Sequence, residues 1–199
     1  MNWFTASPLR TAIVVVSTLV VSVVIFSAVM TVLAFSGGPG QCTPGGGPIT
    51  VNAANADSFD QKWDDMDAIL DSGSPSSITL NESEVSSRAD RFFTEENALD
   101  FRDVRVCIHD GYAEATANLD AILGLQVELK FKGTIDLTGD APKTDVDDLD
   151  FGLIPGWLVD VVEAIGAEGD IDEALDDIEL KHTYTPTLTE GQVRIDGVP

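Results

Sequence analysis

The sequence predicts an α+β protein, in which an N-terminal transmembrane helix precedes an antiparallel β-sheet of about five to six strands packed against two to three helices. Three observations indicate this fold class. Residues 11–35 carry no charge, residues 57–94 repeat apolar side chains with the period of a helix, and from Phe101 onward the period changes to two. The chain beyond the apolar stretch, about 150 residues, is long enough for one domain with a substantial core.

The apolar stretch at residues 11–35 reads TAIVVVSTLVVSVVIFSAVMTVLAF, and a helix needs ~20 apolar residues to span a bilayer core. Arg10 is the only basic residue before it, and the next one is Lys62. This asymmetry predicts a cytosolic leader at residues 1–10 and a single-pass protein of the cell membrane, with its C-terminal domain outside the cytoplasm. The alternative is a cleaved signal peptide, whose apolar region is usually shorter, ~7–15 residues.

The chain after this stretch is strongly acidic. The formal net charge is −23, and all 34 Asp and Glu residues lie at or beyond Asp57. Such a surface repels nucleic acid and anionic lipid headgroups, so no nucleic-acid partner is expected. A solvated face explains the charge most simply, with adaptation to a salty habitat and a set of cation sites as the other interpretations. The acidic run 145–150 lacks the glycine and closing glutamate of an EF-hand loop.

Two cysteines, Cys42 and Cys107, are present. Outside the cytosol such a pair predicts one disulfide, and two unlinked thiols are the alternative. Their spacing suits no metal site. Cys42 lies within residues 36–50, SGGPGQCTPGGGPIT, whose glycines and prolines predict a flexible stem between the membrane anchor and a domain at residues 51–199.

Two helices are expected at the start of this domain. The first covers residues 57–71 and ends before Gly73 and Pro75; its apolar side chains recur on one face, at Phe59, Trp63, Met66 and Leu70. The second covers residues 78–94, where Asn81 and Glu84 have the spacing of a capping box. Its expected apolar side consists of Val85, Ala89, Phe92 and Phe93.

An antiparallel meander follows. Its first two strands alternate apolar and polar residues on either side of a hairpin turn at Asp110 and Gly111. A third strand alternates from Leu125 to Leu137. The fourth, at about residues 143–152, loses its alternation between Val146 and Leu149, which predicts a bulge.

The C-terminal part of the chain predicts one more helix and a closing hairpin. Pro155 is expected to open the helix, since proline is favoured at a first helical turn. Alternation from Ile178 to Tyr184 predicts a fifth strand. Glu190 and Gly191 then form the turn before a last short strand.

The sequence shows no constellation of catalytic residues. His109 and His182 each lie in a strand pattern without a second ligand at metal-binding spacing, so a structural role is expected for both. No nucleophile motif, phosphate-binding glycine loop or dinucleotide fingerprint is present. We therefore expect a protein that is not an enzyme and that has no cofactor and no metal site.

Two stretches of the sequence resemble a known superfamily. ITLNESEVSS at residues 78–87 is similar to a helix start, and LTEGQVRIDG at residues 188–197 to a closing hairpin, of the tubular lipid-binding (SMP/BPI-like) proteins. Ile154 and Pro155 before a helix also fit. The resemblance covers residues 57–199 and is strongest to small bacterial single-module relatives in domains of unknown function. It implies a strongly curved sheet wrapped around a long helix, with an apolar groove that binds lipid.

These patterns lead to two hypotheses about function. Under the first, the domain binds a lipid or another apolar ligand in a groove over the alanine-rich strand. Under the second, it is a non-catalytic structural or interaction domain displayed at the cell surface. The residues expected to line the groove are Ala113, Ala115, Ala117, Leu125, Val127, Leu129, Phe131, Trp157 and Val161.

Overall fold

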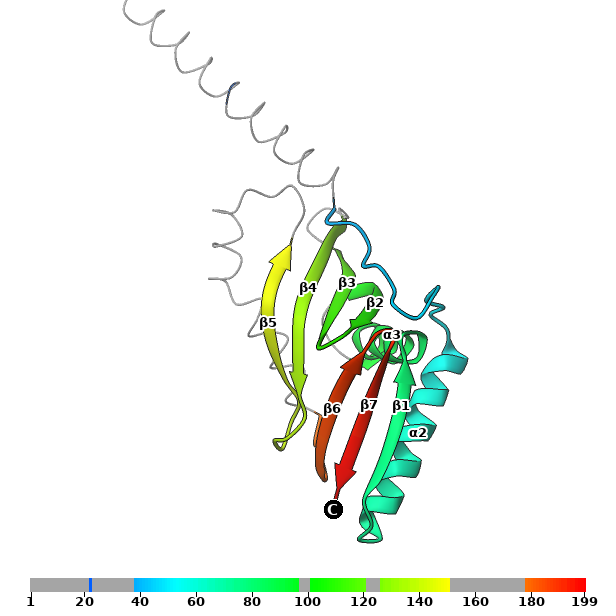
Figure 1. Cartoon of the computed structure of the whole chain (residues 1–199). Coiled ribbons are helices and arrows are strands. Elements are labelled where there is room, and N and C mark those ends of the chain that lie inside the picture. The colour runs from blue at the N-terminus through cyan, green and yellow to red at the C-terminus, as the bar shows by residue number, and fades with distance from the viewer. Residues whose placement is uncertain (1–21, 23–37, 97–100, 121–125, 151–177) are drawn as a thin grey trace, which may run out of the picture.

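The computed structural model of this chain describes residue 22 and residues 38–96, 101–120, 126–150 and 178–199. The described part contains two helices, a π-helical turn and seven strands (Figure 1). In chain order they are α2 (Ala53–Asp71), β1 (Ser76–Asn81), α3 (Glu82–Arg91), the π-helical turn η1 (Phe92–Glu96), β2 (Phe101–His109), β3 (Tyr112–Asp120), β4 (Gln126–Asp136), β5 (Lys143–Asp150), β6 (Thr183–Thr189) and β7 (Gln192–Val198).

The strands form two antiparallel sheets. Sheet A has the order β1-β7-β6, and sheet B is the meander β2-β3-β4-β5. In Figure 1, α2 runs alongside β1, while α3 lies between the two sheets and against β2. β1 follows α2 directly in the chain, yet it pairs with β7, with Leu80 opposite Val193. The first and last strands of the described domain therefore close sheet A together.

The predicted fold class is wrong. The described residues are mostly β, in two sheets with seven strands, rather than one sheet packed against two to three helices behind a transmembrane helix. Among the described residues, no helix is both long and apolar enough to cross a bilayer. This finding contradicts the predicted single-pass localisation in the cell membrane. The stretch at 11–35, the expected membrane partner, lies outside the described residues apart from Ser22, and so does the helix expected from Pro155.

The first helix begins earlier than its apolar pattern indicated. The side chain of Asn52 caps it by accepting a hydrogen bond from the N–H of Asn55 at 2.8 Å. The predicted capping box is confirmed, because Asn81 accepts from the N–H of Glu84, and the Glu84 carboxylate accepts from the N–H of Asn81, both at 3.0 Å. Residues 76–81, however, form β1. The second helix therefore starts at Glu82 and not at Ile78.

The predicted turns and the bulge are confirmed. Gly111 and Gly191 have φ angles of 83° and 77° in the turns between β2 and β3 and between β6 and β7, a region that glycine enters without steric cost. The register of β4 and β5 shifts between Lys132 and Gly133, which lie opposite Asp148 and Val146. The strand β5 therefore carries the extra residue within the predicted interval.

The main core lies between α2, sheet A and the adjoining ends of sheet B. Tyr184 of β6 is 1% exposed, packs against the Trp63 ring at 5.0 Å and donates a hydrogen bond to Asp67 at 2.5 Å. Its buried hydroxyl is therefore paired, as buried polar groups require. The buried members of this core are Met66, Leu70, Leu80, Ile108, Leu137, Tyr184, Val193 and Ile195.

Helix α3 covers the outer edge of β2 with polar side chains. The backbone N–H groups of alternate β2 residues donate to three α3 side chains spaced four residues apart. Four helical residues rise about 6.0 Å and two strand residues about 6.6 Å, so the two repeats stay nearly in step over this length. The pairs are Val104 with Asp90 (2.9 Å), Val106 with Ser86 (2.8 Å) and Ile108 with Glu82 (2.8 Å).

This arrangement closes one edge of sheet B. A strand edge with free N–H groups invites pairing with another chain, and here those donors are satisfied by the helix. It also explains the burial of polar side chains in α3, because Glu82 and Ser86 are 3% and 0% exposed. The sequence pattern placed the apolar side of this helix at Val85 and Ala89, which the structure leaves half-buried.

Candidate ligand pocket

Residues 38–52, here called the strap, lie along the domain before α2 begins (Figure 1). At one end the strap backbone at Gly38 runs close against β4, since a Cβ added there would lie 2.0 Å from the Glu128 carboxylate. Further along, Arg105 of β2 donates a hydrogen bond from Nη1 to the Gln41 side-chain oxygen at 2.9 Å. The strap thus passes from β4 to β2 across sheet B, whereas the sequence predicted a flexible stem.

A disulfide fixes the strap next to this crossing. Cys42 and Cys107 are joined by an S–S bond, with their Cα atoms 5.9 Å apart. Both residues are buried, at 6% and 0% exposure. Disulfides persist under oxidising conditions, so the attachment of the strap to β2 through this bond requires an oxidising environment.

Glu82 holds the next segment of the strap. Its carboxylate accepts hydrogen bonds from the N–H groups of Gly45 and Gly46, each at 2.9 Å, in addition to that of Ile108. The Glu82 N–H donates to the Gly191 carbonyl at 3.3 Å. One buried side chain therefore connects the strap, β2 and the helix that carries it, while its backbone reaches the β6–β7 turn.

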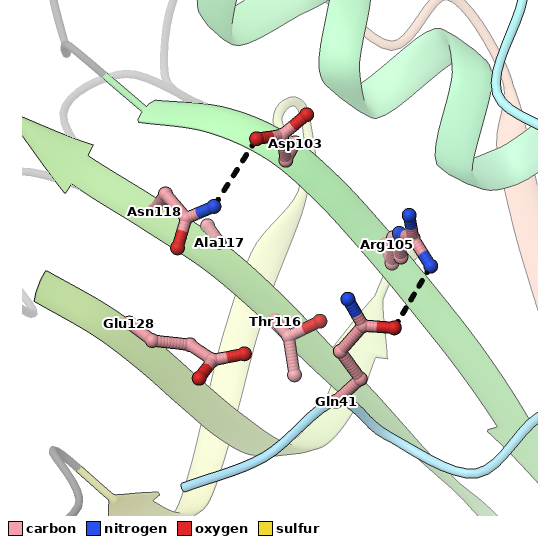
Figure 2. A pocket seen from close by; sticks show the side chains of 7 residues that line it. All are labelled: Gln41, Asp103, Arg105, Thr116, Ala117, Asn118 and Glu128. Carbon is pink, nitrogen blue, oxygen red and sulfur yellow. Dashed lines mark hydrogen bonds between the residues drawn. The ribbon is translucent and has the colours of Figure 1, made fainter. Parts of the chain in front are cut away.

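A small polar pocket lies where the strap crosses sheet B, and Figure 2 shows its lining side chains. Its volume is about 140 Å³. Cross-strand pairing explains the convergence, because Arg105 lies opposite Thr116, and Asn118 lies opposite Glu128. The lining residues are Gln41, Asp103, Arg105, Thr116, Ala117, Asn118 and Glu128.

Asp103 enters this pocket from an irregular stretch of β2. The β2–β3 register shifts between Arg102 and Arg105, and Asp103 has a φ angle of 53°. Residues other than glycine adopt this left-handed region uncommonly, with Asp and Asn among the most frequent. The Asn118 amide donates to the Asp103 carboxylate at 3.2 Å. Bulges commonly re-aim side chains near functional sites, and this one accompanies the carboxylate that lines the pocket.

The pocket combines charges of both signs. Asp103 and Glu128 contribute carboxylates, and Arg105 contributes a guanidinium that donates to the neutral Gln41 amide. The neighbouring cation on β4, Lys130, pairs instead with Glu114 at 2.8 Å. The pocket can therefore offer a cationic donor and two anionic acceptors to one ligand, with amide and hydroxyl groups between them.

The structure brings together part of the predicted apolar groove. Ala115 lies opposite Phe131 and Ala117 opposite Leu129, so these side chains share one face of sheet B next to Ala113. Val127 belongs to β4, opposite Leu119. The predicted groove residues Leu125, Trp157 and Val161 lie outside the described residues. Among the described groove residues, Ala117 also lines the polar pocket.

No protein-family model, curated protein or solved structure matches this chain. The resemblance to the tubular lipid-binding proteins therefore stays a prediction.

Sequence reasoning missed the polar pocket. The sequence places Gln41 in a stem and gives Asp103, Asn118 and Glu128 no feature that separates them from other polar residues near strands. The available signal was the broken alternation in β2, since Asp103 interrupts the pattern just before Val104, Val106 and Ile108. A bulge could have been suspected there, but the strap crossing over it carries no local signature.

Proposed function

We propose that this chain is a non-catalytic binding domain that holds a small polar ligand in the pocket beneath the strap. The observation that carries the proposal is the convergence of Asp103, Arg105 and Glu128 under a segment that a disulfide anchors. Ligand sites typically combine concave shape with a few convergent polar groups. This proposal keeps the interaction-domain hypothesis and specifies that the partner is a small molecule.

Two further features support this use of the pocket. The left-handed backbone at Asp103 has a conformational cost, and such residues cluster at ligand-binding and active sites. The disulfide and Glu82 hold the strap at two adjacent points, Cys42 and Gly45–Gly46. A wall fixed in this way is pre-organised, which reduces the entropy lost on binding.

A thermal-shift screen tests the proposal. The purified chain would be heated with a panel of amino acids, polyamines, dicarboxylates and monosaccharides, each at millimolar concentration. Binding to the folded state raises the midpoint by mass action. We expect at least one class to raise it, and the shift to disappear in Asn118→Phe, which fills the pocket. No shift with any class, or an equal shift in Asn118→Phe, would contradict the proposal.

The apolar-ligand hypothesis has less support from the described residues. It requires a groove over Ala113, Ala115 and Ala117, but part of its predicted lining lies outside the described residues. Adding a medium-chain fatty acid to the same screen separates the two hypotheses. A shift with the fatty acid that persists in Asn118→Phe would favour the apolar groove.

A further inference from the structure

We infer that the ligand of this pocket is a compact zwitterion, a molecule that carries one ammonium and one carboxylate group. The inference rests on the proposed function and adds the ligand's chemical class. Its basis is the separation of charge within the pocket. Figure 2 shows Arg105 with Gln41 at one end and Asp103 with Asn118 at another, while the Glu128 carboxylate reaches in from β4 beside Thr116.

The Arg105 end matches a carboxylate. Its guanidinium presents parallel N–H donors that fit a carboxylate in a two-pronged geometry. In the structure one of these donors, Nη1, is held by the Gln41 amide oxygen at 2.9 Å. A ligand carboxylate exchanges this neutral acceptor for a charged one, and hydrogen bonds between ionised groups are roughly twice as strong as neutral ones. Gln41 then remains free to donate its amide N–H to the same ligand group.

The opposite end matches an ammonium group. Asp103 supplies an acceptor-only carboxylate, and the Asn118 side chain that donates to it also carries an acceptor oxygen; Glu128 adds a second carboxylate from β4. Thr116 is 3% exposed and lies between the two ends, where its hydroxyl can bond to either ligand group.

The size of the pocket limits the ligand. A volume of about 140 Å³ accommodates a few heavy atoms but not a long chain. The pocket's carboxylates outnumber its guanidinium by one, and a free anion would be repelled by the net charge of −23. A zwitterion avoids this repulsion while still satisfying Arg105.

Calorimetric titration of the full chain tests the ligand class. The probes are glycine, β-alanine and diglycine, which differ in the separation of their charges, with propionate and propylamine as analogues that each carry one charge. We expect at least one zwitterion to bind ~10-fold or more tightly than both analogues, since each lost charged hydrogen bond costs about that factor. Equal binding of propionate or propylamine would overturn the zwitterion assignment.

Paired variants then locate the two ends. Arg105→Gln and Asp103→Asn should each weaken zwitterion binding ~10-fold or more, and asparagine tolerates the left-handed backbone at position 103. The matched controls Arg194→Gln and Asp64→Asn lie on β7 and α2, and should bind as the wild type does.

Because the wild-type comparison of probes needs no variant, it remains decisive even if a variant misfolds. If another class raises the thermal midpoint while no zwitterion binds, the ligand class is wrong but the binding domain stands; if no class binds, both proposals fail.

Discussion

The carboxylate of Glu82 in α3 accepts the backbone N–H of Ile108 in β2 at 2.8 Å, although the two residues are 26 positions apart in the chain. The same carboxylate accepts the N–H groups of Gly45 and Gly46 in the strap. A buried acceptor with three donors is costly to alter, because any donor left unpaired keeps its full desolvation penalty. Glu82 therefore links the strap, and with it the pocket wall, to the stability of the domain.

Replacing Glu82 by Gln should destabilise the protein by about 1–3 kcal/mol. Glutamine retains one acceptor oxygen and turns an amide donor toward an N–H group of the strap. Urea unfolding measures the change, and hydrogen exchange at Gly45 and Gly46 should become faster. The control is Glu179→Gln, an exposed change expected to stay within about 0.5 kcal/mol. Equal stability of the two variants would show that the Glu82 contacts contribute nothing measurable.

Replacing Ser86 by Ala tests the polar edge of α3. Ser86 is fully buried and its hydroxyl accepts the Val106 N–H at 2.8 Å. Without it, the β2 donor is buried and unpaired, so we expect a loss of about 1–3 kcal/mol in the free energy of unfolding. Ser74→Ala, at an exposed position after α2, is the matched control. An unchanged midpoint for Ser86→Ala would mean that water replaces the hydroxyl without cost.

Acid should weaken the fold partly through Glu84. Burial alone would raise the pKa of this carboxyl, but hydrogen bonds from Lys62, Ser58 and the Asn81 N–H outweigh it and hold the pKa below its ordinary value. A lowered pKa in the folded state stabilises the protein above the unfolded pKa, and this stabilisation is lost as the pH falls through the folded pKa. The advantage of wild type over Glu84→Gln should therefore be largest near neutral pH and shrink in acid.

Unfolding curves from pH 7 to acid measure that difference. Other carboxylates titrate in the same range, so the absolute stability is less informative than the gap between wild type and Glu84→Gln. The exposed variant Glu179→Gln should give a curve parallel to that of the wild type. A gap for Glu84→Gln that stays constant across the pH range would refute the assigned role.

Removing the Cys42–Cys107 disulfide should lower the free energy of unfolding by about 4 kcal/mol, because the unfolded chain regains the entropy of the loop that the bond closes. The two cysteines are 65 positions apart. The Cys42→Ser, Cys107→Ser double variant in urea measures the loss against the oxidised wild type. Thiol labelling of the unreduced, denatured protein should give no label, and two labels per chain would contradict the bond.

Local features of this fold were predictable because neighbouring residues encode them. The capping box of Asn81 and Glu84 and the turns at Gly111 and Gly191 depend on a few consecutive side chains. The bulge opposite Gly133 likewise broke the apolar alternation of its own strand.

The arrangement in space was not predictable, because it depends on pairs distant in the chain. β1 joins β7 through Leu80 and Val193, and no periodicity reports that partnership. The sequence pattern therefore predicted the short alternating stretch before Asn81 as part of the following helix, although it forms β1. For the same reason Glu82, Ser86 and Asp90 read as an exposed polar face, although a strand edge lies against them. The pocket escaped prediction for the same reason, since it requires the strap, β2, β3 and β4 together.

The most direct test of the binding-domain account is a ¹H–¹⁵N NMR titration of the full chain with whichever compound of the two probe sets binds best. We expect saturable shifts concentrated on the backbone amides of Gln41, Arg105, Thr116, Asn118 and Glu128, with the side-chain amides of Gln41 and Asn118 among the largest. Amides of β7, such as Arg194, should not move. Shifts absent at all concentrations, or spread evenly over sheet A and sheet B, would contradict the account.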